Sequence, residues 1–449
     1  MKRFILGISA ILILTTWGCM PAAPAPTEMV IPPSSTATLS PTPTNTPTPQ
    51  ATSTPTLTPS PTPGPDIDLL YFSGGEIRRF HMQDWSEEII PVQNNGKIQF
   101  AALSPDQSWL AYKDDEGTHI LKNPFETQFS PSKTYFVYNA GFSFSNDNAM
   151  LAYSDDVGLQ LHNLNENTSY ELLTHSLNFE DLSKYHSFSP KQWSPDNQWL
   201  WISVFHWEGI SYLLANIPTQ TLYLFNGCYS DIKWLPDSQS FLATVRFSGM
   251  YGCGEEDGVY LVTLNKNGTY TEKRIYEDSL PAPVWDREST ALSLSPDNKL
   301  ISFAQIHFPY TTTDVSRLIS SNLNGGDQKE LDDVSGRIAS PLWSEDGKSI
   351  TYIVQRSGIS AIKRIITDSG EITELCLLPE HVVFTSNIDG TSWLVAINED
   401  AIYRNDYAEY GIYLINEDTG EVIKVSGPNE VIDVQLSPTA TPREPKIPE

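Results

Sequence analysis

The sequence has few basic residues, few cysteines and no long apolar run beyond its N-terminal leader. It carries 28 Lys and Arg against 55 Asp and Glu, a formal net charge of −27. A chain this acidic repels phosphate backbones, which argues against nucleic acid as a partner. It also repels anionic lipid headgroups, so any membrane attachment has to come from a lipid anchor. No later stretch is apolar enough to span a bilayer.

The familiar catalytic motifs are missing as well. The sequence contains no G-x-S-x-G, which excludes the nucleophile elbow of an α/β-hydrolase. It contains no H-E-x-x-H and no C-x-x-C pair, so the common zinc motifs are missing too. Its eight His are scattered, and we interpret them as individual structural or surface residues. We therefore predict no catalytic residue, metal or cofactor.

The N-terminus carries an export signal. Lys2 and Arg3 form a short basic region, and residues 4–14 form an apolar run of 11 residues, too short to cross a membrane. The sequence Thr-Trp-Gly-Cys that follows resembles a bacterial lipobox, which implies lipidation of Cys19 after removal of residues 1–18. The alternative is an ordinary secretory signal in which Cys19 has no role.

Pro-rich segments flank the remainder of the chain. In residues 20–65, 14 of the 46 positions are Pro, and most of the rest are Thr, Ser or Ala. Such chain favours polyproline II and cannot form a core, so 19–65 is predicted to be a disordered stalk. A shorter Pro-rich stretch closes the chain at 439–449. The folded domain is predicted over 66–438.

A short sequence word recurs through this domain. It reads WSPDNQWLWIS at 193–203, and its relatives contain Asp106, Asp147, Asp196, Asp237, Asp297, Asp346 and Asp389. Successive Asp residues are 41 to 60 positions apart, and an apolar segment follows each of them. Gly, Asn and Asp punctuate aromatic and β-branched runs, which is typical of short antiparallel strands. Each unit has room for four strands, the content of one β-propeller blade.

The word resembles the repeat of TolB-type, WD-like β-propellers, which is W-S-P-D-G-K followed by an apolar strand. The resemblance covers seven units, essentially all of 100–430. Asn146 replaces Pro in one unit, and Leu235 replaces Ser in another. The resemblance implies the fold, and members of the family often serve in envelope protein complexes, but a fold does not determine a function.

The ends of the domain bear on the number of blades. Residues 67–95 look like the last three strands of a blade, and residues 431–438 (VIDVQLSP) look like a first strand alone. Together they predict a blade closed by both termini, which would leave no open edge in the ring. The expectation is an all-β propeller of eight four-stranded blades. The alternative is seven, if the terminal segments pack differently.

Each part of the word has a predicted structural role. Trp193, Trp234 and Trp343 should pack between blades at the end of the first strand. Pro should end that strand because it has no N–H to donate, and Asp should cap the turn. A ring of carboxylate ligands is the functional alternative for these Asp residues, and we favour the turn.

The cysteines suit an exported protein. Cys228 and Cys253 lie in loops that a propeller places on the same face, so we predict a disulfide between them. Two free thiols are the alternative. Cys376 lies within an apolar run and is predicted to be a small buried group.

The loops between second and third strands are repeatedly acidic, and aromatic residues accompany several of them. We predict a possible binding rim there, for a basic protein surface, cations or sugar rings. The alternative is that Asp and Gly simply suit hairpin turns and keep the domain soluble. The rim consists of Asp114, Asp115, Glu116, Asp155, Asp156, Trp207, Glu208, Glu255, Glu256, Asp257, Glu399 and Asp400.

These observations favour a membrane-anchored, extracytoplasmic lipoprotein that holds a non-catalytic binding or scaffold propeller on a stalk. Its expected partner is a protein or glycan of the cell envelope. The alternative is a propeller hydrolase or lyase that acts on polysaccharide, with its site at the channel mouth.

Overall fold

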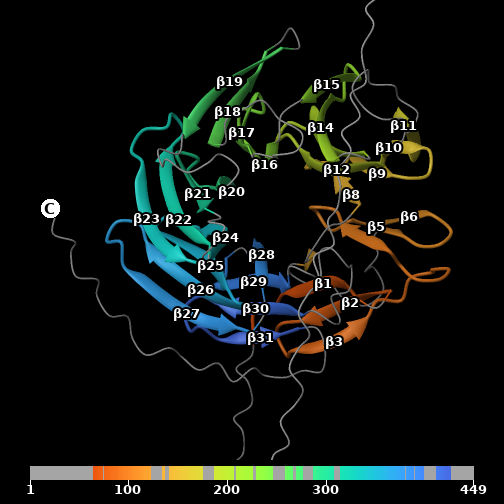
Figure 1. The fold of residues 1–449 in the computed structure, drawn as a ribbon. Coiled ribbons are helices and arrows are strands. Elements are labelled where there is room, and N and C mark those ends of the chain that lie inside the picture. The colour runs from red at the N-terminus through yellow and green to blue at the C-terminus, as the bar shows by residue number, and fades with distance from the viewer. Residues whose placement is uncertain are drawn as a thin grey trace, which may run out of the picture. The chain divides into compact units, whose positions relative to one another are not determined.

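A computed structural model gives the fold (Figure 1). It describes residues 64–73, 75–122, 134–136, 141–174, 187–206, 209–225, 229–245, 258–265, 269–276, 287–307, 314–379, 381–388, 390–398 and 411–425. Strands are the regular elements of these segments, and none of the described residues is helical. The prediction of an all-β fold is confirmed.

The described strands form eight sheets, which we call blades A to H. Those of the first four blades are β1 (Asp68–Ser73), β2 (Glu76–His81), β3 (Ser86–Ile89) and β7 (Thr134–Phe136) in A; β4 (Phe100–Leu103), β5 (Trp109–Lys113) and β6 (Thr118–Lys122) in B; β8 (Phe142–Phe144), β9 (Met150–Ser154), β10 (Gly158–Asn163) and β11 (Thr168–Thr174) in C; and β12 (Ser187–Trp193), β13 (Trp199–His206), β14 (Gly209–Asn216) and β15 (Thr221–Phe225) in D.

Each of the other four blades has four strands. Their strands are β16 (Tyr229–Trp234), β17 (Ser240–Val245), β18 (Gly258–Leu264) and β19 (Tyr270–Tyr276) in E; β20 (Arg287–Leu294), β21 (Leu300–His307), β22 (Val315–Asn322) and β23 (Lys329–Ser335) in F; β24 (Arg337–Trp343), β25 (Ser349–Arg356), β26 (Ile359–Ile366) and β27 (Ile372–Leu378) in G; and β28 (Val382–Asn387), β29 (Trp393–Asn398), β30 (Ile412–Asn416) and β31 (Val422–Lys424) in H. In blades B to H the sheet order follows the chain order.

The blades form a closed ring because every neighbouring pair shares a cluster of buried apolar side chains (Figure 1). One cluster joins blade A to both B and H, and six others join B–C, C–D, D–E, E–F, F–G and G–H. Both faces of a blade are therefore covered, so its strands read as nearly continuous apolar runs. All six residues of β29 are buried, for example. The ring has eight blades, as predicted, and not seven.

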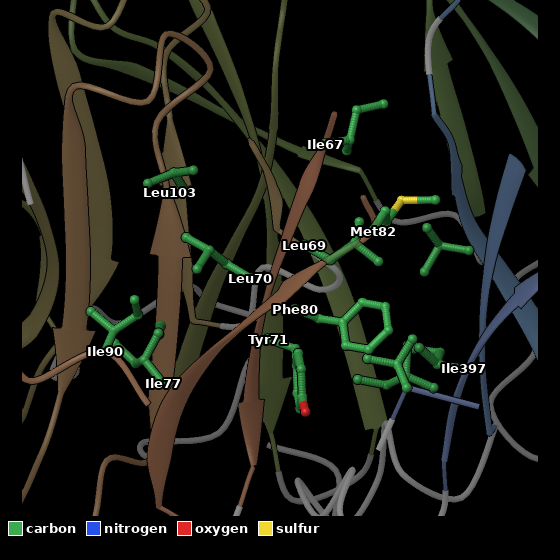
Figure 2. Packing of buried hydrophobic residues seen from close by; sticks show 14 of the residues in the cluster. Ile67, Leu69, Leu70, Tyr71, Ile77, Phe80, Met82, Ile90, Leu103 and Ile397 are labelled. Atoms are coloured by element: carbon green, nitrogen blue, oxygen red, sulfur yellow. The ribbon is translucent and has the colours of Figure 1, made fainter. Parts of the chain in front are cut away.

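Blade A closes the ring by side-chain packing (Figure 2). On one side of its strands Leu70 lies with Leu103 of blade B, and on the other side Phe80 lies toward Ile397 of blade H. The first described sheet of the chain thus packs directly on the last one. No strand is shared between blades A and H in the part of the chain that the structure describes.

The innermost strand of blade A differs from the prediction. The strands β1, β2 and β3 take the second to fourth positions, as expected from residues 67–95. The first position, assigned to 431–438, is taken by β7, which pairs parallel with β1 over Asp68–Leu70. Residues 431–438 lie outside the described residues. A parallel pair requires a long crossover, and here the chain between β1 and β7 runs through β2, β3 and the three described strands of blade B.

Blade B has three described strands and correspondingly weaker burial. Its third strand, β6, has four half-buried residues and an exposed Lys122, whereas five of the six residues of the equivalent strand β10 are fully buried. No fourth strand covers β6 among the described residues. The segment that follows β6 in the chain contributes β7 to blade A instead.

The Trp residues of the word lie between blades, as predicted. Trp193 is 4% exposed in the C–D cluster, Trp234 lies in the D–E cluster and Trp343 in the F–G cluster. The indole of Trp193 also donates a hydrogen bond from Nε1 to the carbonyl oxygen of Ser143 in blade C, 3.0 Å away. Blades C and D are therefore joined by a polar contact within an apolar one.

Replacing Trp193 with Phe should lower the free energy of unfolding by about 1–3 kcal/mol, because the Ser143 carbonyl loses its buried donor. Trp343→Phe is the matched control, since its similarly buried Nε1 has no hydrogen-bond partner among the described residues. We expect the control to cost less than Trp193→Phe in urea unfolding followed by far-UV circular dichroism. Equal losses for the two variants would contradict a contribution from the hydrogen bond.

Candidate binding face

The strand order gives the ring two different faces. We call turn face the side that carries the turns from first to second and from third to fourth strands. We call loop face the opposite side, which carries the connections from second to third strands and from each blade to the next. The repeated word lies on the turn face, and the predicted acidic rim lies on the loop face.

On the turn face, the word forms a closed set of hydrogen bonds. In blade D, Ser194 Oγ donates to Asp196 Oδ1 over 2.6 Å, and the backbone N–H groups of Gln198 and Trp199 donate to Asp196 Oδ1 and Ser194 Oγ. Blades B, C, F and G repeat this arrangement around Asp106, Asp147, Asp297 and Asp346. The interpretation of these Asp residues as turn caps is confirmed.

Two units use substitutes for parts of the word. In blade E, where Leu235 replaces Ser, Asp237 accepts from the backbone N–H groups of both Gln239 and Ser240. In blade H, the hydroxyl of Thr391 accepts from the backbone N–H of Trp393. Asp389, which the word assigns to this unit, lies outside the described residues. The turn geometry is thus kept even where the sequence departs from the repeat.

Neighbouring turns are also linked to each other. The residue after the Asp has a left-handed backbone, with φ of 57° at Asn148 and 60° at Asn197, which Asn tolerates well. Its side chain accepts from the preceding blade: Asp106 N donates to Asn148 Oδ1, and Asn146 N donates to Asn197 Oδ1. Many hydrogen-bond donors and acceptors of the turn face are therefore already paired within the fold.

The loop face, in contrast, exposes large apolar side chains. Eight such side chains are exposed in the described part of the chain, and seven of them lie at strand ends on the loop face. These seven are Ile89, Val157, Phe205, Ile210, Val315, Ile359 and Leu377, with exposed fractions of 36% to 55%. Only Leu300 lies on the turn face.

The apolar positions were missed by the sequence analysis, although the sequence holds a signal for them. Val157, Ile210 and Ile359 each lie directly beside a Gly at a second-to-third-strand connection, where hairpins normally carry polar residues. Phe205 and Ile210 also face each other across the β13–β14 pair. The exposed apolar side chains therefore distinguish the loop face from the turn face.

The predicted acidic rim is described only in part. Asp115, Glu116 and Asp156 are exposed on the loop face, whereas Asp114 is buried and Asp155 is half-buried. The remaining members, Trp207, Glu208, Glu255, Glu256, Asp257, Glu399 and Asp400, lie outside the described residues. The rim therefore remains a prediction.

Asp114 and Asp155 have the same local role in their loops. Asp155 Oδ1 accepts from the backbone N–H groups of Val157 and Gly158, each over 2.9 Å. Asp114 accepts from the N–H groups of Glu116 and Gly117 in the equivalent turn. Two acidic residues of the predicted rim, Asp114 and Asp155, are thus hairpin caps.

Asp114 also anchors the connection from blade A to blade B. Its carboxylate accepts from Asn95 N over 2.8 Å and contacts His119 Nε2 over 2.9 Å, and the His119 ring stacks on Tyr112. Burial opposes ionisation of this carboxyl, but the hydrogen bonds from Asn95, His119 and Glu116 outweigh it and lower its pKa to about 2. The ionised form is the one that the fold stabilises.

Replacing Asp114 with Asn should destabilise the domain in a pH-dependent way. A carboxyl with a lowered pKa contributes stability above its ordinary pKa near 3.8 and loses it as the pH falls toward 2. The difference in unfolding free energy between wild type and Asp114→Asn should therefore be largest above about pH 5 and shrink between pH 4 and 2. A difference that stays constant over this range in urea unfolding would contradict the assignment. Asp156→Asn, which changes an exposed carboxyl of blade C, is the control at pH 6.

The predicted cysteine chemistry falls mainly outside the described residues, which is the case for Cys19, Cys228 and Cys253. Cys376 is buried and unbridged in blade G, as predicted, and burial raises the pKa of its thiol to about 12. Among the described residues, no three His, Cys, Asp or Glu side chains gather closely enough to hold a metal ion. Nor does this part of the chain contain a helix with the length and hydrophobicity of a membrane span.

No family model and no curated protein sequence matches the chain. Solved structures do. TolB from Acinetobacter baumannii is 16% identical over 67% of this chain and 75% of its own, with a TM-score of 0.33. A putative TolB from Agrobacterium tumefaciens is 16% identical over 61% and 94%, with a TM-score of 0.32. An oligogalacturonate lyase from Vibrio parahaemolyticus is 12% identical over 78% and 97%, with a TM-score of 0.43. The likeness concerns the fold alone.

Proposed function

We propose that this protein is a membrane-anchored extracytoplasmic scaffold whose propeller binds another envelope protein through its loop face. The observation that carries the proposal is the distribution of exposed apolar side chains, seven of which lie on that face and one on the other. Burial of these side chains against a partner would add favourable apolar contact. Among the described residues, the turn face exposes one large apolar side chain, Leu300.

The apolar positions are spread over several blades. They occur at loop-face ends of strands in blades A, C, D, F and G. A partner that covers them would contact much of the ring, as expected for a protein and not for a small molecule. A glycan would instead require aromatic side chains, and Phe205 is the only aromatic among these seven.

A photo-reactive benzoyl-phenylalanine placed at single positions tests the face directly. The chain is expressed in its native bacterial host and irradiated. With the probe at Ile210 or Ile359, it should give a discrete cross-linked protein band. The probe at Leu300, similarly apolar but on the turn face, should give none. Bands of equal intensity from both faces, or bands from Leu300 alone, would contradict the proposal.

The anchor belongs to the proposal as well. Lipidation of Cys19 would attach the chain to a membrane, and the Pro-rich residues 20–65 would hold the propeller away from that membrane. A lifted domain can meet a partner without bringing its acidic surface close to anionic lipids.

Cys19→Ala should therefore release the protein from the membrane fraction of the envelope and abolish its labelling by radioactive palmitate. Cys376→Ala, which removes a buried thiol, is the control and should leave the protein in the membrane fraction. A Cys19→Ala protein that stays membrane-bound and labelled would show that another site is lipidated.

A further inference from the structure

The hairpin between β25 and β26 forms a tip on the loop face of blade G. Two residues, Ser357 and Gly358, close it with φ of 44° and 83°. Positive φ at both central positions is typical of the tight type I′ turn that suits twisted hairpins. Arg356 and Ile359 flank the turn as a cross-strand pair, so both side chains point to the same side of the sheet.

Two contacts hold the tip in place. The backbone N–H of Gly358 donates to Nε2 of His381, 3.1 Å away, just before β28 of blade H. The side chain of Arg356 lies against Gly336, where a Cβ would come within 2.6 Å of Arg356 Cγ and 3.0 Å of Nε. Gly336 therefore leaves room for the arginine stem, and the backbone of the tip is fixed before any partner arrives.

Arg356 is exposed and has no hydrogen-bond or ion-pair partner among the described residues. Other arginines of the domain do have carboxylate partners: Arg78 with Glu76, and Arg364 with Asp418. The chain has a net charge of −27, so acidic side chains are abundant, yet none of the described ones pairs with Arg356. Arg356 is therefore available to bind a carboxylate of another molecule. Arginine suits this role because its planar guanidinium can bind both oxygens of a carboxylate.

Apolar surface lies beside this cation. Ile359 is 47% exposed and Leu377 is 48% exposed. Leu377 pairs with Ala361, two residues from Ile359 on the same strand, so the two apolar side chains lie diagonally on one side of the sheet. An arginine bordered by aliphatic side chains has the composition of an interaction hot spot.

We infer that this tip anchors a partner segment in which a carboxylate side chain lies next to a branched apolar one. Arg356 binds the carboxylate, and Ile359 and Leu377 cover the apolar side chain. The inference rests on the proposed function and adds the chemistry that the partner must carry at this point. The negative charge of the rest of the protein repels an acidic segment from other positions, so the tip also fixes where such a segment binds.

The test measures fluorescence anisotropy with a fluorescein-labelled peptide, Gly-Leu-Asp-Leu-Asp-Gly, titrated with the detergent-solubilised full chain. We expect saturable binding that weakens about tenfold in Arg356→Ala and in Ile359→Asp. Arg356→Lys should recover only part of the affinity, because an ammonium group cannot form the two-point contact. A peptide with Lys in place of Asp should not bind.

The controls are on the turn face. Lys299→Ala removes an exposed cation, and Leu300→Asp changes an exposed apolar residue, so both should leave the affinity within about twofold of wild type. Unchanged affinity in Arg356→Ala, equal binding of the Lys peptide, or no anisotropy change at millimolar protein would overturn the inference. Thermal unfolding of each variant confirms that it is folded.

The outcome is separable from that of the proposed function. If Arg356→Ala abolishes peptide binding but cross-linking from Ile210 fails, the tip stands and the face-wide scaffold falls. If cross-linking from Ile210 persists in Arg356→Ala and the peptide never binds, the scaffold stands and the tip falls.

Discussion

Apolar packing between neighbouring sheets is the constraint on which the rest of this structure depends. The described blades share no hydrogen-bonded strand, so the ring is held by eight joints of buried side chains. Each blade packs on a neighbour with both of its faces, so both faces must be apolar. This explains fully buried strands such as β29. The requirement is strictest at blade A, whose two faces must fit blades far apart in the sequence. There the fit is made by Leu70 toward blade B and Phe80 toward blade H.

Because packing occupies the flanks of every blade, only the two faces of the ring remain for other roles, and the chain uses them differently. On the turn face, polar side chains form hydrogen bonds within the fold. Each Ser–Asp pair caps its own turn, and residues such as Asn197 accept from the neighbouring turn. Where a unit departs from the word, another acceptor such as Thr391 takes over, because a lost acceptor would leave backbone N–H groups without a partner. The loop face has no comparable network repeated from blade to blade among the described residues. Apart from caps such as Asp114 and Asp155, its exposed side chains differ from blade to blade.

This division explains what the sequence could predict. The word recurs because packing and turn capping recur, so it revealed seven of the eight blades, the position of Trp193 and the role of Asp196. The strand pattern of residues 67–95, and not the word, located the second to fourth strands of blade A. The word did not reveal β7, which pairs parallel with β1 although the two strands are far apart in the sequence. Nor did the acidic character of the loops reveal which of their carboxylates are exposed to solvent. Asp114 and Asp115 are adjacent, yet the first is buried as a cap and the second is exposed.

In the proposed binding tip of blade G, an exposed side chain depends on the strand beside it. In blade G, one row of the sheet runs from Gly336 past Arg356 to Ile359. The absence of a side chain at Gly336, which also has a φ of 124°, leaves the space in which Arg356 lies. A residue with a Cβ there would both strain the backbone and displace the arginine stem. The position of the Arg356 side chain therefore depends on a glycine in the chain segment beside it. Specificity on a propeller can thus be set by the strands beneath a loop as well as by the loop.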